Sequence, residues 1–218
     1  MKAVVLGGTG ACGKAILASL LSSSAVERVV TIGRRPVTVP DQAQLEQSGK
    51  LVQVTTEMAA IAQAEDAFKG ADVVMCAFGT TRKQAGSAEA FKKIDQEYVV
   101  AAAATAKRAG VPHFMYISSH GASASSWFLY LQSKGQTENG IIAQKFDKVS
   151  ILRPGLLDRG DESRFVEKFA MVFTSGCKTT TIGEAMRELA AAYLTDKASS
   201  GDAVQYVDDA TIRRLGKQ

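Results

Sequence analysis

Residues 2–16 read KAVVLGGTGACGKAI, and the fold class can be predicted from this stretch outward. The apolar run that opens it stops at a glycine, as a buried strand does, and residues 14–23 continue with the spacing of a helix. Between them, Gly7, Gly10 and Gly13 recur at every third position. Glycine permits a tight turn and close backbone approach to a pyrophosphate, and the helix that follows offers unpaired N–H groups to the phosphates. The stretch therefore predicts a dinucleotide-binding turn, the alternative being a glycine-rich turn without a ligand.

The rest of the chain continues the alternation of strands and helices. Apolar runs predict strands over 28–33, 51–56, 71–79, 113–119, 148–154 and 203–207. Helical patterns cover 89–108, 125–145, 162–173 and 183–195, with a short helix at the C-terminus. The central runs are apolar throughout, which is typical of strands covered on both faces. We expect one α/β domain over residues 1–218, a doubly wound parallel sheet, with 158–182 as a small lid or substrate segment.

Composition narrows the class of protein. The 218 residues are 46% hydrophobic and 22% charged, as in ordinary soluble domains, and the net charge is only +4. The basic residues are scattered, so we expect no nucleic-acid partner. The three cysteines lie far apart without metal-ligand spacing, which favours a reducing compartment, and we expect a cytoplasmic protein. We expect no leader before the strand at Lys2, and the apolar run YVVAAAATA is too short to span a bilayer.

The end of the second strand indicates which dinucleotide is bound. A carboxylate at this point would bind the 2′-hydroxyl of NAD, but the chain reads TIGRRP over 31–36. Arg34 and Arg35 stand where the adenosine ribose should lie, and an arginine fork can bind a phosphate bidentately. NADP(H) is therefore predicted over NAD(H), the alternative being a solvated surface pair. Cys12, in the glycine loop, is read as a small residue beside the phosphate rather than an activated thiol.

The stretch YLQSKG, residues 130–135, holds a candidate catalytic pair. Tyr130 and Lys134 share one face of a helix, and the strand before them ends in Ser118 and Ser119. Parallel strands bring their carboxyl ends to one edge of the sheet. A free phenol has a pKa of about 10, but an ammonium and an oxidised nicotinamide nearby favour the phenolate. We predict Tyr130 as acid/base, Lys134 as its support and as a ribose ligand, and Ser119 as the group that binds the carbonyl oxygen. Tyr130 and Lys134 are both expected to contact the cofactor as well.

Together these motifs resemble those of the short-chain dehydrogenases/reductases over nearly the whole chain. The resemblance is closer still to an atypical branch, the Tat-interacting-protein oxidoreductases. Its residues are LGGTGACGK, TIGRRP, FGTTRKQAG, ISSHGASASSWFLYLQSKGQTE, KFDKVSILRPGLL and ESR, in that order. The resemblance implies a Rossmann fold, NADP(H) as cofactor and a small carbonyl or alcohol as substrate.

The resemblance also implies further site residues. The cofactor contacts that it carries over are Thr9, Gly10, Ala11, Cys12, Arg34, Arg35, Phe78, Gly79, Leu157 and Arg164. Phe78 and Leu157 could instead be core residues, and Arg164 a surface arginine. Many members have an asparagine that organises a proton relay where this chain has Asp95, which puts that relay in doubt. The chain after residue 154 is also short for a substrate domain.

Three functions remain open at this point. The first is an NADP(H)-dependent oxidoreductase. The second is an NADPH-binding regulator with a protein partner and little turnover, and the third, disfavoured by the short C-terminal region, is sugar-nucleotide epimerisation or dehydration. Thr80, Thr81 and Arg82 follow the fourth strand, beside the predicted nicotinamide. Arg82 or Thr81 is predicted to contact substrate or shape its pocket, the alternative being a loop held by its own side-chain hydrogen bonds. Either a monomer or a homodimer is compatible with the sequence.

Overall fold

The computed structural model describes residues 1–158, 176–196 and 202–217. Among these residues, seven parallel strands form one sheet in the order β3-β2-β1-β4-β5-β6-β9. Their bounds are β1 Lys2–Leu6, β2 Arg28–Gly33, β3 Leu51–Thr55, β4 Val73–Cys76, β5 His113–Ile117, β6 Lys148–Arg153 and β9 Val204–Asp208. The chain moves outward from β1 to β3 and then crosses back to the other side of β1, so the switch point lies between β1 and β4. Ligands of such sheets bind at the carboxyl ends of the strands beside this point. The predicted doubly wound α/β fold is confirmed.

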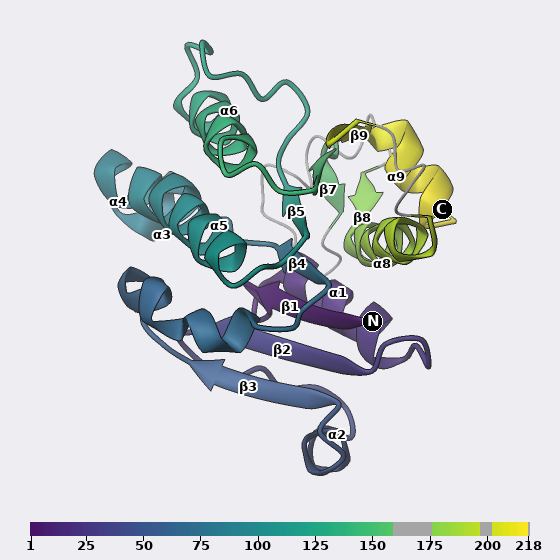
Figure 1. Ribbon diagram of the computed structural model, residues 1–218. Helices are drawn as coiled ribbons and strands as arrows, with labels where there is room; N and C mark the ends of the chain where they lie inside the picture. Colours follow the sequence, from purple (N-terminus) through teal and green to yellow (C-terminus); the bar gives the residue numbers. More distant parts are fainter. Residues whose placement is uncertain (159–175, 197–201, 218) are drawn as a thin grey trace.

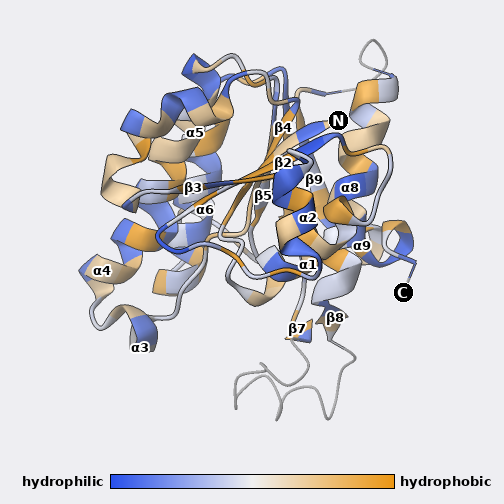
Figure 2. Ribbon diagram, turned by 90° about the horizontal axis from the view of Figure 1, so that it is seen from below, coloured by the Kyte–Doolittle hydropathy of each residue, from blue (hydrophilic) through white to orange (hydrophobic). Residues whose placement is uncertain are grey.

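Helices cover both faces of the sheet (Figure 1). On one face lie α1 (Ala11–Leu21), α8 (Thr179–Thr195) and α9 (Asp209–Leu215). On the other lie the 3₁₀ segment η1 (Met58–Phe68), α5 (Tyr98–Arg108) and α6 (Leu129–Ile142). Each face of the sheet has its own cluster of buried apolar side chains. Figure 2 shows largely apolar strands in the middle, between helices that carry both hydrophobic and hydrophilic residues.

The helix predicted over 89–108 is interrupted in the structure. It consists of α4 (Ala88–Lys92), a π-helical stretch η2 (Lys93–Glu97) and then α5. π-helical stretches inside α-helices are rare and occur often at functional sites. Here the stretch contains Asp95, whose side chain is fully buried.

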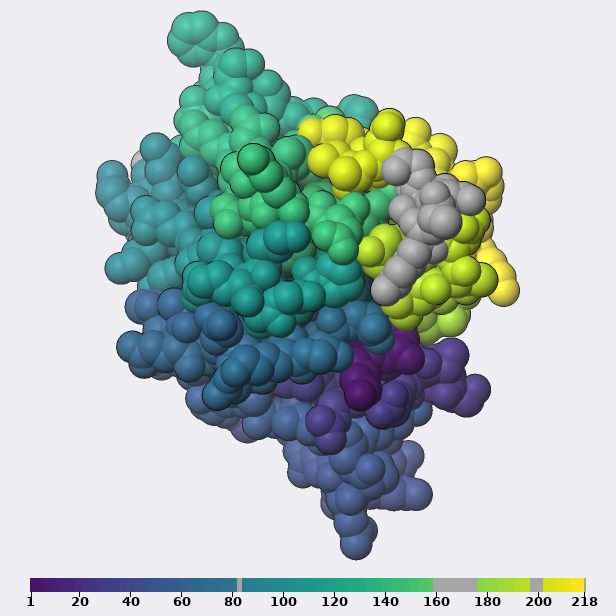
Figure 3. Space-filling view, viewed as in Figure 1, coloured from purple at the N-terminus to yellow at the C-terminus, as the bar shows by residue number. Residues whose placement is uncertain are grey.

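Several other elements differ from the prediction. The prediction missed α2 (Gln42–Gln47), η1, α3 (Arg82–Ala85) and the small sheet of β7 (Leu157–Asp158) with β8 (Cys177–Lys178). Such short elements lack the long periodic patterns on which sequence prediction depends. Helix α6 begins at Leu129 rather than 125, and the segment that precedes it projects from the surface (Figure 3).

The expected substrate segment, 158–182, is described only at its ends. Residues 159–175, which include Arg164 and the predicted helix 162–173, lie outside the described residues. The described end of the segment forms β8 and the first turn of α8. No helix in the described part of the chain is long and apolar enough to cross a bilayer.

Candidate functional site

The glycine loop between β1 and α1 is held by backbone contacts that leave no room for a side chain at Gly7 or Gly13. Gly7 has φ +82, a conformation that favours glycine, and its carbonyl accepts a hydrogen bond of 3.0 Å from the Gly10 N–H. A Cβ at Gly13 would lie 2.0 Å from the Gly7 carbonyl oxygen. At Gly10, by contrast, a Cβ would meet only that oxygen, at 3.5 Å. Gly10 also caps α1 without a side chain, so this turn fits a phosphate group as the sequence predicts.

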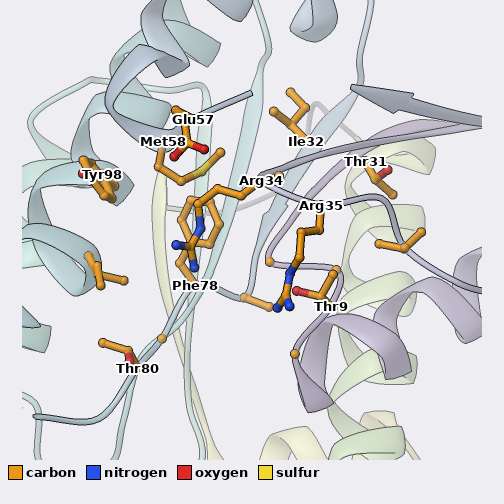
Figure 4. A pocket seen from close by; sticks show the side chains of 18 of the residues that line it. Thr9, Thr31, Ile32, Arg34, Arg35, Glu57, Met58, Phe78, Thr80 and Tyr98 are labelled. Atoms are coloured by element: carbon orange, nitrogen blue, oxygen red, sulfur yellow. The ribbon is translucent and has the colours of Figure 1, made fainter. Parts of the chain in front are cut away.

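A cavity of about 380 Å³ opens beside this loop, a volume within the range of small-molecule sites. Gly7, Thr9 and Gly10 line one side of it. Arg34 and Arg35, in the turn after β2, line it as well, and Figure 4 shows both side chains extending into the cavity, Arg35 toward Thr9. The structure therefore brings the predicted phosphate loop and the predicted arginine pair to one cavity.

The far side of the same cavity is apolar. Ile32, Met58, Phe78 and Tyr98 line it, with the carboxylate side chain of Glu57 beside Met58 (Figure 4). Flat apolar walls with a few polar groups suit a heteroaromatic ring. Glu57, Met58 and Tyr98 were not predicted as site residues, because they come from η1 and its N-cap and from α5, whose approach to the cavity only the packing reveals.

A second cavity, of about 280 Å³, continues from the first. The two share Gly10, Ala77, Phe78, Gly79 and Thr80. The second cavity is further lined by Ala11, Cys12, Gln84, Asp95, Ile117, Ser118, Tyr130, Lys134 and Leu157. The predicted Tyr–Lys pair thus borders the same continuous space as the glycine loop.

Tyr130 and Lys134 have very different surroundings within this cavity. Tyr130 is 44% exposed, and its ring centre lies 6.4 Å from that of Phe91. Lys134 is buried, and its Nζ donates hydrogen bonds to the Tyr116 hydroxyl at 2.9 Å and the Ile117 carbonyl at 3.2 Å. Its side chain is therefore held in one position.

The charge of Lys134 is stabilised inside the protein. Burial opposes it, but Tyr116, Asp95 and Tyr130 surround the ammonium and raise its pKa above the ordinary value. Asp95 Oδ2 lies 3.6 Å from Lys134 Nζ, and Asp95 Oδ1 accepts a hydrogen bond of 2.6 Å from the Thr80 N–H. Burial raises the pKa of the Tyr116 phenol, so this hydroxyl is neutral and acts as an acceptor for Lys134.

The two serines at the end of β5 point to different places. Ser118 is buried, lines the second cavity, and donates its hydrogen to Glu138. Glu138 is also buried and accepts hydrogen bonds from the Arg153 guanidinium. The Ser119 hydroxyl donates instead to the His120 carbonyl, at 3.2 Å, and Ser119 lines neither cavity. The sequence singled out Ser119, whereas the structure brings Ser118 to the cavity.

Of the two threonines that follow β4, one lines the cavities and the other holds its own loop. Thr80 lines both cavities. The Thr81 hydroxyl accepts a hydrogen bond of 3.1 Å from the Gln84 N–H, which holds the loop at the start of α3. The side chain of Arg82 lies outside what the structure describes, so its predicted contact with substrate stays a prediction.

Comparisons with known proteins agree with this geometry. Residues 7–168 match a family model described as NAD(P)H-binding. The chain is 40% identical to the rat protein HTATIP2 over 78% of this chain and 68% of that protein. It is 47% identical to the protein FMP52-1, mitochondrial, of Scheffersomyces stipitis, over 72% of this chain and 67% of that protein.

The fold also matches solved structures. The short-chain dehydrogenase/reductase YIR035C of Saccharomyces cerevisiae superposes with a TM-score of 0.70 at 15% identity, covering 98% of each chain. At that identity the likeness concerns the fold alone. The family match and the relatives agree with the resemblance drawn from the sequence motifs. The chain therefore belongs to the NAD(P)H-binding family, in the atypical group of short-chain dehydrogenases/reductases that contains HTATIP2 and FMP52.

Proposed function

We propose that this protein is an NADP(H)-dependent oxidoreductase that interconverts a small carbonyl compound and the corresponding alcohol. One observation carries the proposal: Tyr130 and Lys134 line the cavity that the glycine loop also lines. The nicotinamide, when bound, supplies the hydride to the carbonyl carbon or removes it from the alcohol. The chain must then provide the proton and hold the oxygen in place.

Tyr130 is the proposed proton donor in reduction and acceptor in oxidation. Its partial exposure leaves the phenol within reach of a substrate in the cavity. Lys134 is the proposed cation beside the phenol, and its charge is shared with Asp95, 3.6 Å away. A serine at the end of β5 would bind the substrate oxygen: Ser119 is the residue that the sequence predicts, and Ser118 is the one that lines the cavity. The segment 158–182, which follows Leu157 of the cavity wall, is the proposed substrate segment.

Turnover of a panel of aldehydes and ketones with NADPH tests the chemistry. Tyr130→Phe keeps the ring beside Phe91 and removes only the hydroxyl, so we expect kcat to fall by at least about a hundredfold. NADPH affinity should fall by no more than a few-fold, since the proposed phosphate contacts of the glycine loop and the arginine pair are untouched. Tyr206→Phe, at an exposed tyrosine that lines neither cavity, is the matched control and should keep wild-type kcat. Equal kcat in wild type and Tyr130→Phe would refute the assigned role.

The preference for NADP(H) over NAD(H) rests on Arg34 and Arg35 in the first cavity. Fluorescence titration with NADPH and with NADH should give tighter binding of NADPH. Replacing both arginines by alanine removes charge-assisted hydrogen bonds of about 1.5–3 kcal/mol, so NADPH affinity should fall at least tenfold while NADH affinity changes little. Arg108→Ala, whose side chain contacts Glu65 away from the cavities, is the control. Wild-type protein that binds both cofactors equally would contradict this preference.

A second function is favoured by one specific feature of the surface. Trp127 is fully exposed and Phe128 is 73% exposed, immediately before α6. Exposed aromatic pairs of this kind are common where proteins bind partners. An NADPH-binding regulator would bind a protein partner in an NADPH-dependent way and turn over no member of the carbonyl panel. Turnover that depends on Tyr130 would rule this function out as the sole role.

The cellular location and oligomeric state are part of the proposal. Cys76 and Cys177 are buried, and the described residues contain no disulfide, which accords with a reducing compartment. We propose the cytoplasm. The yeast relatives are named as mitochondrial, so fractionation of cells with an antibody to this protein should include that organelle. Sedimentation of the purified protein would decide between a monomer and a homodimer.

A further inference from the structure

The ammonium of Lys134 is fully engaged by the protein. Two of its hydrogens go to the Tyr116 hydroxyl and the Ile117 carbonyl, and the Asp95 carboxylate lies 3.6 Å away. Lys134 and Asp95 are only 4% and 0% exposed as side chains. Water therefore does little to screen the charges of this ion pair.

Asp95 is held rigidly in this position. Its Oδ1 accepts the Thr80 N–H at 2.6 Å, and its main-chain carbonyl accepts the Thr137 hydroxyl at 3.0 Å. The π-helical stretch η2 carries Asp95 against α6, on which Lys134 and Thr137 lie one turn apart. The Thr80 N–H thus holds the carboxylate of Asp95, and Thr137 holds its main chain, beside the ammonium.

The charge of this pair differs from that of a lone lysine. An ammonium alone would favour the phenolate form of a nearby tyrosine, whereas an adjacent carboxylate opposes it. We propose that Asp95 is a positioning residue that largely cancels the charge of Lys134 and thereby raises the pH at which Tyr130 exchanges its proton. The proposal deepens the proposed function, because it assigns to Asp95 the setting of the working pH of the same site.

The other ionisable groups around the pair do not replace Asp95. Cys76 on β4 and Tyr116 on β5 face Lys134 and Asp95, and burial raises the pKa of the Cys76 thiol to about 12 and also raises the pKa of the Tyr116 phenol, so both are neutral. Cys12 of α1 lines the same cavity. Glu138, one turn further along α6, is paired with Arg153. Among the described side chains, Asp95 is the carboxylate in ion-pair contact with Lys134.

A charge cycle tests the proposal without any cofactor or substrate. The four proteins are wild type, Asp95→Asn, Lys134→Met and the double variant, each made with and without Tyr130→Phe. The ultraviolet absorbance of phenolate is followed against pH, and the difference between each pair isolates Tyr130 from the other tyrosines. Asp95→Asn should move the Tyr130 midpoint to lower pH by about one unit, and Lys134→Met should move it up by a similar amount. The double variant, without either charge, should titrate close to wild type.

The outcomes separate the inference from the proposed function. A midpoint that Asp95→Asn leaves unchanged would overturn the inference, whether or not the protein turns over carbonyls. If Asp95→Asn does not fold, because its Lys134 is left buried without a counter-charge, the comparison of wild type with the double variant decides. If the Tyr130 midpoint of the double variant lies above that of wild type by as much as in Lys134→Met, Asp95 does not offset the charge of Lys134, and the inference is wrong. If turnover exists, its pH profile should shift down in Asp95→Asn by the same amount as the titration.

Discussion

Two glycines of the loop after β1 should respond to the same substitution in opposite ways. An alanine Cβ at Gly13 would lie 2.0 Å from the Gly7 carbonyl oxygen and 2.7 Å from the Gly8 Cα, distances that real contacts do not reach. Both neighbours are main-chain atoms, so the turn itself has to move. At Gly10 the nearest atom to the added Cβ is 3.5 Å away, and nothing in the turn has to move. Gly13→Ala should therefore lower the free energy of unfolding, whereas Gly10→Ala should mainly lower the affinity for NADPH.

The structure gives the size of each effect. Overpacking against rigid neighbours costs about 3 kcal/mol at the upper end of its range, and the helix preference of alanine over glycine offsets about 1 kcal/mol. The free energy of unfolding should fall by about 2 kcal/mol in Gly13→Ala, with a loss of about 4–8 °C in Tm for a domain of this size. Gly10→Ala should change the free energy of unfolding by less than about 1 kcal/mol, because only the helix cap is altered.

The binding assay reverses the order of the two variants. Gly10 lines both cavities, so its added methyl group stands where the phosphates are expected, and NADPH affinity should fall at least about tenfold. Urea unfolding followed by circular dichroism and NADPH fluorescence titration measure the two effects. Unfolding free energies of Gly13→Ala and wild type that agree within about 0.5 kcal/mol would refute the packing argument. Unchanged NADPH affinity in Gly10→Ala would refute the phosphate site.

Three further results are expected. Burial, with the nearby charge of Lys148, lowers the pKa of His113 to about 3 in the folded protein. His113 of the unfolded chain has a pKa of about 6.5, so between pH 6.5 and pH 3 the imidazole is protonated in the unfolded chain and neutral in the folded protein. Stability is thus present above pH 6.5 and should fall by about 2 kcal/mol between pH 7.5 and pH 5, a loss that urea unfolding should find reduced in His113→Phe. Iodoacetamide should modify Cys12, which lines the second cavity, more slowly when NADPH is present. It should not modify Cys76, which is buried and whose pKa burial raises to about 12. Mass spectrometry measures the modification of both cysteines, and equal rates at Cys12 with and without NADPH would contradict the first expectation. Ser118→Ala should lower kcat by about a hundredfold and Ser119→Ala by only a few-fold, and the reverse order would restore Ser119 to its predicted role.

Much of the candidate site could be predicted because its parts are local in the sequence. The glycine loop, the arginine pair and the Tyr–Lys pair each lie within a few residues, next to a recognisable strand or helix. A parallel sheet brings the carboxyl ends of its strands to one edge, so the order of elements alone predicts that these motifs converge. The structure has all three along two adjoining cavities, and their chemical roles stay predictions.

The remaining features depend on which residue of a local pattern faces inward. The side chains of neighbouring residues at the end of a strand point to opposite sides. An error of one position in assigning the inward side chain therefore selects Ser119 instead of Ser118. The continuous helical pattern over 89–108 gave no sign of the π-helical stretch that carries Asp95 inward. Hydrophobic periodicity indicates which residues of a helix are buried, but it does not reveal the one extra residue per turn that makes a stretch π-helical.

The parallel sheet, the glycine turn and the positions of the candidate cofactor and catalytic motifs follow from the sequence alone, because each depends on short-range periodicity or on the conformational freedom of glycine. The packing of the folded chain is needed to show that Asp95 lies against Lys134, and that Ser118 donates to a carboxylate held by Arg153. These contacts join residues that lie 15 to 39 positions apart in the sequence, on different elements. Their geometry follows from how helices pack on the sheet, and that packing is set by the whole core rather than by any one segment.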